Sequence, residues 1–166
     1  MSGLVEAYLN KNLETAVARY DTALAINPSS APAWLWSTSA HAWLGQGEEA
    51  VKRAPRAIEL SPFDPHMYMF TSIAGTAQAV AGEYDKSIEY CRRSLRENRM
   101  FASTHRILTI SLALSERVEE ARQAAIELLA IEPGLTISGF RYRYPGNASR
   151  HTDLFCGALA AAGVPP

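Results

Sequence analysis

Apolar and small residues recur along the chain at helical spacing, in stretches separated by short turn segments. Within each stretch the apolar positions stand three and four residues apart, which is typical of an amphipathic α-helix. The pattern predicts helices over residues 12–26, 32–44, 47–60, 66–81, 84–97, 101–115 and 118–131, and a last helix over 149–162. Glycine, proline and asparagine lie between several of these stretches, at residues 27–30, 45–47 and 82. We therefore expect an all-α protein.

The helical pattern repeats with a period of 34 residues. Ala16, Tyr20, Ala23 and Pro28 are matched, each 34 residues later, by Ala50, Ala54, Ala57 and Pro62. The pattern recurs at Ser87, Cys91 and Ser94, and 34 residues later at Ala121, Ala125 and Leu128. Repetition at this period predicts stacked helical pairs. Because a small side chain lets two helices approach closely, Ala50 and Ala57 are expected to be buried.

Trp34, Gly45, Glu48-Glu49-Ala50, Ala57 and Pro62 together resemble the tetratricopeptide (TPR) repeat, over about residues 4–133. The resemblance implies antiparallel helix-turn-helix repeats stacked in a right-handed superhelical solenoid, here about 3.5 repeats and a C-terminal capping helix. It also implies two parts, a repeat solenoid over 1–133 with an incomplete first helix, and a connector with a capping helix over 134–166. Glu116 replaces the glycine between the helices of the last repeat, so a less sharp turn is expected there.

A second resemblance lies at the C-terminal end, in Pro133-Gly134-Leu135-Thr136, Arg143-Tyr144-Pro145, Gly157-Ala158-Leu159 and Ala162-Gly163-Val164-Pro165. These segments are similar to the ends of bacterial proteins in which TPR repeats follow a class III adenylate cyclase or a winged-helix domain. The resemblance implies the C-terminal regulatory or scaffolding part of a larger bacterial signalling protein. It also implies that the natural C-terminus is near.

The N-terminal end provides only the last turns of a first helix. Its beginning is absent when the repeat spacing is counted back from Ala16. Since solenoid repeats contact only their neighbours, we expect Leu4, Val5, Tyr8 and Leu9 to form an apolar edge. Such an edge would promote self-association of the chain.

Charge and composition narrow the function classes. The 16 Lys and Arg residues nearly balance the 17 Asp and Glu residues, which argues against direct nucleic-acid binding. No apolar run approaches the roughly 18 residues of a membrane span. The two cysteines, Cys91 and Cys156, lack metal-ligand spacing and are too few for a secreted disulfide scaffold. We therefore expect a cytoplasmic protein.

No catalytic, metal or cofactor constellation stands out. The histidines, His41, His66, His105 and His151, are dispersed without a metal-binding motif. No nucleophile elbow surrounds a serine, and Gly45-Gln46-Gly47 lacks the rest of a phosphate loop. The four aspartates are isolated, so the resemblance to cyclase-linked repeats does not bring cyclase chemistry to this chain. We expect no catalysis, metal or cofactor.

Two charged segments have alternative interpretations. Arg92, Arg93, Arg96 and Arg99 form a basic run that could bind an acidic partner or phosphate. Glu89 stands four residues before Arg93, and ordinary surface pairs at this spacing are the favoured explanation. The second segment, Phe140-Arg141-Tyr142-Arg143-Tyr144, could stack single-stranded bases. Packing of its aromatic rings on the last repeat is favoured.

In TPR proteins the first helices line a concave groove that binds peptides. By this resemblance the partner-binding groove is expected to contain Leu35, Ser39, Trp43, Ser72, Thr76, Arg106 and Ile110. The leading hypothesis is a non-catalytic module that binds a peptide or a domain surface there. A rival is a stand-alone regulatory subunit with a small apolar ligand near Trp34, Trp36 and Trp43, and a weaker one is an enzyme fragment.

Overall fold

The chain folds into antiparallel helical pairs, as the periodicity predicts. The structure is a computed structural model and describes residues 3–8, 12–146 and 149–166. Its helices are α1 (Gly3–Tyr8), α2 (Leu13–Ile26), α3 (Ala31–Trp43), α4 (Gly47–Leu60), α5 (Met67–Val80), α6 (Tyr84–Glu97), α7 (Ala102–Leu114), α8 (Val118–Ile131), α9 (Ile137–Arg143) and α10 (Arg150–Ala161). No strand occurs within the described residues. The all-α fold class is confirmed, and α9 is a helix that the sequence pattern did not predict.

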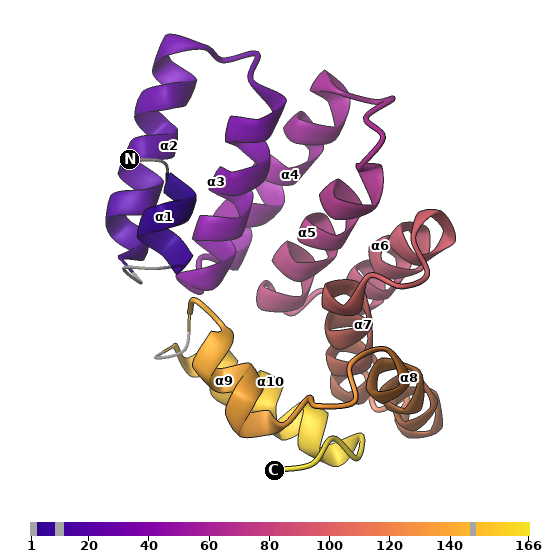
Figure 1. The fold of residues 1–166 in the computed structure, drawn as a ribbon. Helices are drawn as coiled ribbons and strands as arrows, with labels where there is room; N and C mark the ends of the chain where they lie inside the picture. Colours follow the sequence, from indigo (N-terminus) through magenta and orange to yellow (C-terminus); the bar gives the residue numbers. More distant parts are fainter. Residues whose placement is uncertain (1–2, 9–11, 147–148) are drawn as a thin grey trace.

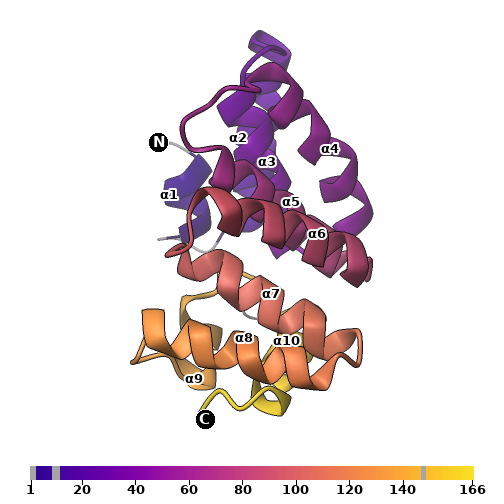
Figure 2. The same ribbon diagram turned by 90° about the vertical axis from the view of Figure 1, so that its right-hand side faces the viewer.

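The pairs stack along a curved axis. α3 packs with α4, α5 with α6, and α7 with α8, while α4 also contacts α5 and α6 contacts α7. The first helices α3, α5 and α7 contact one another in order, and Figure 1 shows them along the inner side of the curve. Figure 2 shows the stack from the side, with α9 and α10 at the end opposite α2.

Small residues occupy the close helix crossings. Ala50 is fully buried and Ala57 is 1% exposed, which confirms the expectation from the repeat. In the third copy the equivalent residues are the fully buried serines Ser87 and Ser94. Ser87 Oγ donates to the Gly75 carbonyl oxygen at 2.8 Å, and Ser94 Oγ donates to the Tyr68 carbonyl oxygen at 2.7 Å. Serine is accommodated here because its hydroxyl has a partner.

The turns that join α3 to α4, α5 to α6 and α7 to α8 have one geometry. Gly45 and Gly82 have φ of 79° and 82°, and Glu116, which replaces glycine, has φ of 61°. After Glu116 the Arg117 amide donates to the Leu112 carbonyl oxygen at 3.0 Å. Equivalent bonds close the two glycine turns, from Gln46 to His41 and from Glu83 to Gln78. The expected less sharp turn at Glu116 is therefore wrong, because these bonds hold the backbone in the left-handed region.

The C-terminal segment folds back across the concave side. α10 packs on α7 and α9, and its Phe155 and Leu159 are fully buried. Residues 144–146, which lie between α9 and α10, reach the end of α3. Gly146 is so close to the Trp43 carbonyl oxygen there that a Cβ on this residue would overlap with it. The His151 ring lies beside Gly45, in the turn between α3 and α4. The C-terminal segment thus links the last repeat to the end of α3.

The predicted N-terminal apolar edge falls outside the described parts of the chain. Leu9 is not described, and neither are the side chains of Leu4, Val5 and Tyr8. On the same helix, Glu6 pairs with Arg19 of α2 through Oε1 and Nη2 at 3.2 Å. The expected self-association through this edge stays a prediction.

Candidate functional site

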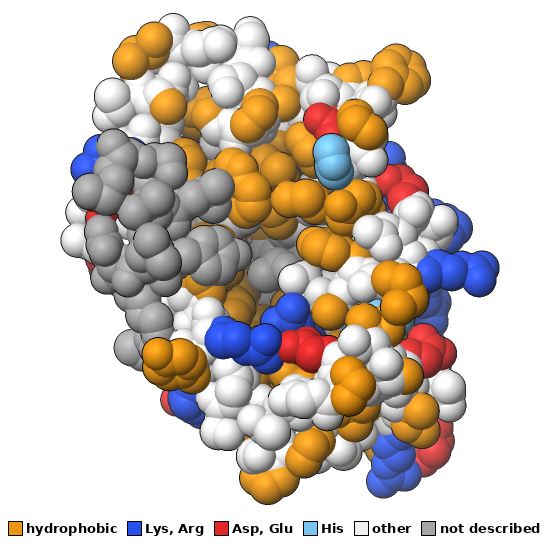
Figure 3. Space-filling view, viewed as in Figure 1, with side chains coloured by type: hydrophobic (Ala, Val, Ile, Leu, Met, Phe, Trp, Pro, Cys, Tyr) orange, Lys and Arg blue, Asp and Glu red, His pale blue; other side chains and the backbone are white. Residues whose placement is uncertain are grey.

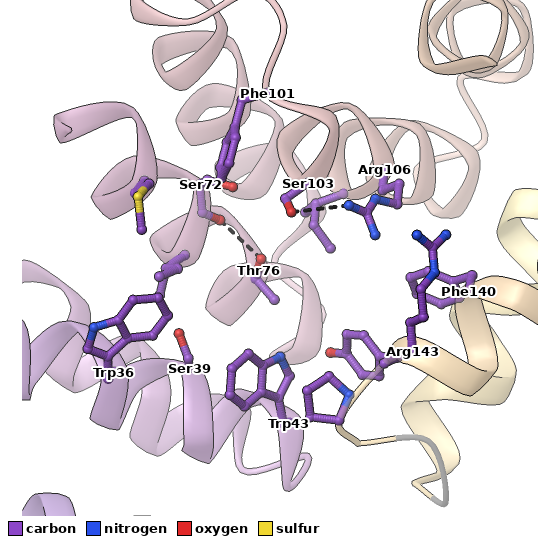
Figure 4. Close-up of a pocket in the computed structure, with 15 residues that line it drawn as sticks. Trp36, Ser39, Trp43, Ser72, Thr76, Phe101, Ser103, Arg106, Phe140 and Arg143 are labelled. Atoms are coloured by element: carbon purple, nitrogen blue, oxygen red, sulfur yellow. Dashed lines mark hydrogen bonds between the residues drawn. The ribbon is translucent and has the colours of Figure 1, made fainter. Parts of the chain in front are cut away.

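A cavity of about 280 Å³ lies on the concave face, between the first helices and the returning C-terminal segment. Its lining from the repeats is Trp36, Ser39 and Trp43 of α3, Met69, Ser72, Ile73 and Thr76 of α5, and Phe101, Ser103, Arg106 and Ile107 at α7. Phe140 and Arg143 of α9, with Tyr144 and Pro145, complete the wall. Figure 4 shows these side chains converging on one space from four parts of the chain.

The repeat itself places these residues together. Residues three and four apart on a helix share one face, so Ser72, Ile73 and Thr76 point the same way. The 34-residue period puts Ser72 and Arg106 at equivalent places of successive first helices, and likewise Ile73 and Ile107. Stacking of α5 on α7 therefore continues one lining from repeat to repeat.

Five of the residues predicted for the groove line this cavity: Ser39, Trp43, Ser72, Thr76 and Arg106. Leu35 and Ile110 do not. Leu35 is 5% exposed and packs in a core cluster with Ala57 and Phe70, while the fully buried Ile110 belongs to the main core. Both lie four residues from a lining residue, Ser39 and Arg106 respectively, but their side chains are covered by neighbouring helices and do not reach the cavity.

The predicted peptide groove omitted part of the lining, although Trp36 was among the residues expected near a small apolar ligand. Trp36, one residue after Leu35, faces the cavity, whereas the Trp34 indole lies outside it and donates to the Pro28 carbonyl oxygen at 2.9 Å. The wall from α9 was missed because that helix was not expected. Its sequence signal is Thr136, whose hydroxyl caps the helix by accepting from the Gly139 amide at 3.0 Å.

Two arginines and one glutamate lie together at one end of the cavity. Arg143 Nη2 is 2.8 Å from Glu132 Oε1, and Arg106 Nε is 3.6 Å from Glu132 Oε2. Arg106 also donates from Nη2 to Ser103 Oγ at 3.3 Å. Glu132 directly follows the last residue of α8, so this cluster joins α7, α8 and α9. Two guanidinium groups therefore approach the same carboxylate.

The expected packing of the aromatic segment is met only in part, because Tyr142 is 77% exposed and the ring contacts of Tyr144 beyond α9 are made with α10. Phe140 is 3% exposed and lies with its ring centroid 5.3 Å from that of Tyr144. Tyr144 is also buried and contacts the rings of His151 and Phe155. Burial lowers the pKa of His151 to about 4. This packing holds the C-terminal wall of the cavity in place.

The ion pairs of the basic run at α6 differ from those expected. The described residues provide an ion pair for Arg92, to Glu120 of α8 at 2.9 Å, but none for Arg93, Arg96 or Arg99. The expected pair between Glu89 and Arg93 is therefore wrong, since exposed pairs of long side chains gain little over water. Arg92, Arg96 and Arg99 border an open groove between α6 and α8, outside the cavity described above.

Two other features are absent from the described residues. The described parts of the chain contain no group of three His, Cys, Asp or Glu side chains that could hold a metal ion. Among its described helices, none has the length and apolar character needed to cross a membrane.

Known structures share this fold. TTC0263, described as a thermophilic TPR protein in Thermus thermophilus, superposes with a TM-score of 0.67 at 20% identity, over 95% of this chain and 81% of that one. MamA gives 0.65 at 18% identity, over 93% and 88%. YrrB, described as a TPR protein with an unusual peptide-binding site, gives 0.60 at 19% identity, over 96% and 80%. No family model and no curated protein matches the sequence. The comparisons and the helical pairing together show that the chain has the fold of TPR solenoid proteins.

Proposed function

We propose that this chain is a non-catalytic protein-interaction module that binds a segment of a partner protein on its concave face. The observation that carries the proposal is the cavity itself, in which aromatic rings from α3, from α9 and from Phe101, directly before α7, surround one space. Figure 3 shows hydrophobic side chains gathered over this face, with basic and acidic side chains at their lower edge. Exposed apolar surface of this kind is typical of a binding site.

The binding mechanism follows from the lining. An apolar or aromatic side chain of the partner would enter between Trp36 and Trp43 and lose its contact with water. Burying such a side chain provides roughly 1.5–3 kcal/mol, and aromatic contacts add about 0.5–1.5 kcal/mol. Affinity from these contacts should vary only weakly with salt, unlike affinity for a phosphate backbone. That YrrB is a TPR protein with a peptide-binding site supports the proposal.

The first test removes the aromatic wall. Trp43→Ala should weaken capture of the natural partner by about 2 kcal/mol, which is roughly thirtyfold in Kd. Trp43 is buried, at 8% exposure, and belongs to the core, so its removal also changes the packing of the fold. Thr76→Phe is therefore a second variant, which fills the cavity and leaves this tryptophan in place. Circular dichroism confirms that each variant is folded.

The matched control is the double change Arg92→Glu with Arg93→Glu, outside the cavity. Partner capture from a lysate of the source cell is compared among the wild type, both cavity variants and this control. We expect loss in the cavity variants alone. Loss in the arginine variant alone would refute the concave site and favour the convex groove between α6 and α8.

A second candidate is a small apolar ligand held in the same cavity by a stand-alone regulatory subunit. Tyr144 and Pro145 favour it, because they wall the concave face where an open groove would continue. Native mass spectrometry of the purified protein discriminates the two candidates. An added small-molecule mass that disappears in Thr76→Phe would support the ligand.

The proposed role extends to a larger cytoplasmic protein. In this proposal the chain is the C-terminal regulatory or scaffolding part of a bacterial signalling protein, either adenylate cyclase-like or a transcriptional regulator. The resemblance of residues 133–136, 143–145, 157–159 and 162–165 to the ends of such proteins supports it. The coding sequence upstream of Met1 in the source genome is the test, and a cyclase or winged-helix domain encoded there in frame is the expected result.

A further inference from the structure

A second hollow lies on the convex side of the solenoid, between α6 and α8. α7 packs against both helices, and Figure 2 shows it between them. The hollow is an open groove of about 600 Å³. Its lining is Arg92, Leu95, Arg96 and Arg99 from α6 and the turn after it, His105 from α7, and Glu127, Ala130 and Ile131 from α8. None of these residues lines the concave cavity, so the groove is a separate surface.

The two walls of the groove differ in charge. Arginines line the wall formed by α6 and the turn after it, whereas the charged residue of the α8 wall is Glu127. Arg92 is paired with Glu120 at 2.9 Å. For Arg96 and Arg99 the described residues provide neither an ion pair nor a side-chain hydrogen bond. The wall at α6 therefore carries positive charge that is available to an anionic ligand.

Apolar side chains contribute to both walls. Leu95 on one side and Ile131 on the other are half-buried, and Ala130 lies beside Ile131 in the sequence. His105 is 4% exposed, and its Nε2 is 2.8 Å from the Arg99 carbonyl oxygen. This contact ties the turn after α6 to α7. The groove is therefore held in shape within the fold and offers apolar contact beside its arginines.

The spacing of the arginines indicates the form of the ligand. Arg92 and Arg96 stand four residues apart on α6, on one face and about 6 Å apart along the helix axis. Arg99 follows two residues after the end of α6 and extends the row. A single small anion would contact only part of this row. Carboxylates four residues apart on another helix have the same spacing as the arginines, so the row matches an extended acidic face.

We propose that the groove between α6 and α8 binds an acidic amphipathic helix of a partner protein. Its Glu or Asp side chains lie against Arg96 and Arg99, and its apolar side chains contact Leu95 and Ile131. Seating a helix in a groove in this way is a recurring mode of peptide recognition. Glu127 repels an acidic group on the α8 side and so orients the bound helix. The inference goes beyond the proposed function and does not rest on it, because the two surfaces share no residue.

A nucleic-acid strand is the other common polymer with regularly spaced negative charges. Proteins that bind single strands combine basic residues with aromatic side chains on which the bases stack. Among the described residues that line this groove, none is Phe, Tyr or Trp. The groove therefore lacks a stacking surface, and its aliphatic residues suit the side chains of a protein.

The experiment uses three synthetic peptides of about 18 residues, a length that supports a helix. The acidic peptide has Glu at every fourth position and Leu on the adjacent face, and its two analogues have Gln or Lys in place of Glu. Fluorescence anisotropy of the labelled peptides follows their titration with the protein. We expect the acidic peptide to bind about fivefold more tightly than the Gln peptide, as for two exposed ion pairs. Added salt should reduce that preference.

Arg96→Gln with Arg99→Gln is the decisive variant, because both side chains are exposed and have no ion pair to lose within the described chain. It should remove the preference for the acidic peptide. Arg93→Gln with Arg122→Gln is the matched control, which removes the same charge from α6 and α8 outside the groove lining. This control should bind as the wild type does. Glu127→Gln should bind the acidic peptide more tightly, because it removes a like charge.

A charge exchange tests the same contact with opposite signs. Arg96→Glu should weaken binding of the acidic peptide and strengthen binding of the Lys peptide. A variant that merely loses structure would weaken both, so the two effects separate a direct contact from a change in the fold. Circular dichroism confirms that each variant is folded.

The outcomes judge this inference apart from the proposed function. Equal binding of the acidic and Gln peptides overturns it, and so does the absence of binding by either at millimolar concentration. An equal loss in the matched control overturns the location. Tighter binding of a single-stranded oligothymidylate than of the acidic peptide overturns the protein partner. Thr76→Phe should leave these titrations unchanged, and its effect on partner capture judges the concave site alone.

Discussion

Replacing Glu116 by glycine should stabilise the protein. Glu116 has φ of 61°, in a turn whose two counterparts use Gly45 and Gly82 at φ of 79° and 82°. Its carboxylate has no ion pair or side-chain hydrogen bond among the described residues, and the residue is exposed. The substitution therefore acts on the backbone alone.

The magnitude follows from two opposing effects. A residue with a Cβ costs about 1–2 kcal/mol in the left-handed region. Glycine loses about 0.4–1 kcal/mol more than other residues when the unfolded chain becomes ordered. The net gain for Glu116→Gly is then about 0.5–1 kcal/mol, which raises the Tm of a chain of this size by roughly 1–4 °C.

Thermal and urea unfolding followed by circular dichroism at 222 nm provide the assay. Gly82→Ala is the matched reverse substitution, because no atom lies within 4 Å of the added Cβ and only the φ of 82° opposes it. It should destabilise the protein by a similar amount. Unchanged stability in both variants would refute the explanation based on backbone strain.

Three further predictions concern the core and its titratable groups. Ala57→Trp should lower stability by about 1–3 kcal/mol or more, since Ala57 is 1% exposed at a helix crossing, and an unchanged Tm would count against the repeat register. The pKa of His151 is about 4 in the folded protein and 6.5 in the unfolded chain. The free energy of unfolding should therefore be constant with respect to this group above pH 6.5 and should decrease as the pH falls towards 4. Urea unfolding measured over this pH range should show a shallower decrease in His151→Gln. Burial raises the pKa of Cys91 to about 12, so Ellman's reagent should label it at neutral pH only after unfolding, and rapid labelling of native Cys156→Ser would contradict this.

The repeat made most of the fold predictable. Small residues at a fixed period identified the crossings at Ala50 and Ala57, and glycines identified the turns, so the limits of α2 to α8 agree with the expected ranges to within one residue. α9 was missed because its seven residues mix aromatic and basic side chains too briefly to establish a period. The turn at Glu116 was misjudged because hydrogen bonds fix its backbone, and composition does not reveal them.

The candidate site was less predictable. Leu35 and Trp36 differ by one step of the helix, and both are large and apolar, so the pattern alone could not assign one to the core and the other to the cavity. The pairing of Arg106 and Arg143 with Glu132 depends on the path of the C-terminal segment. Such contacts between distant residues leave no periodic signal.

Return of the C-terminal segment to α3 also bears on how the molecule unfolds. Repeats that contact only their neighbours can lose structure one at a time from an end. Here Gly146 lies against Trp43, so contacts span more than half of the sequence. Opening the last repeat should therefore weaken the end of α3 as well. We expect a single cooperative transition with uniform amide hydrogen exchange from α3 to α10, and slower folding than in an open array, because these contacts raise the contact order.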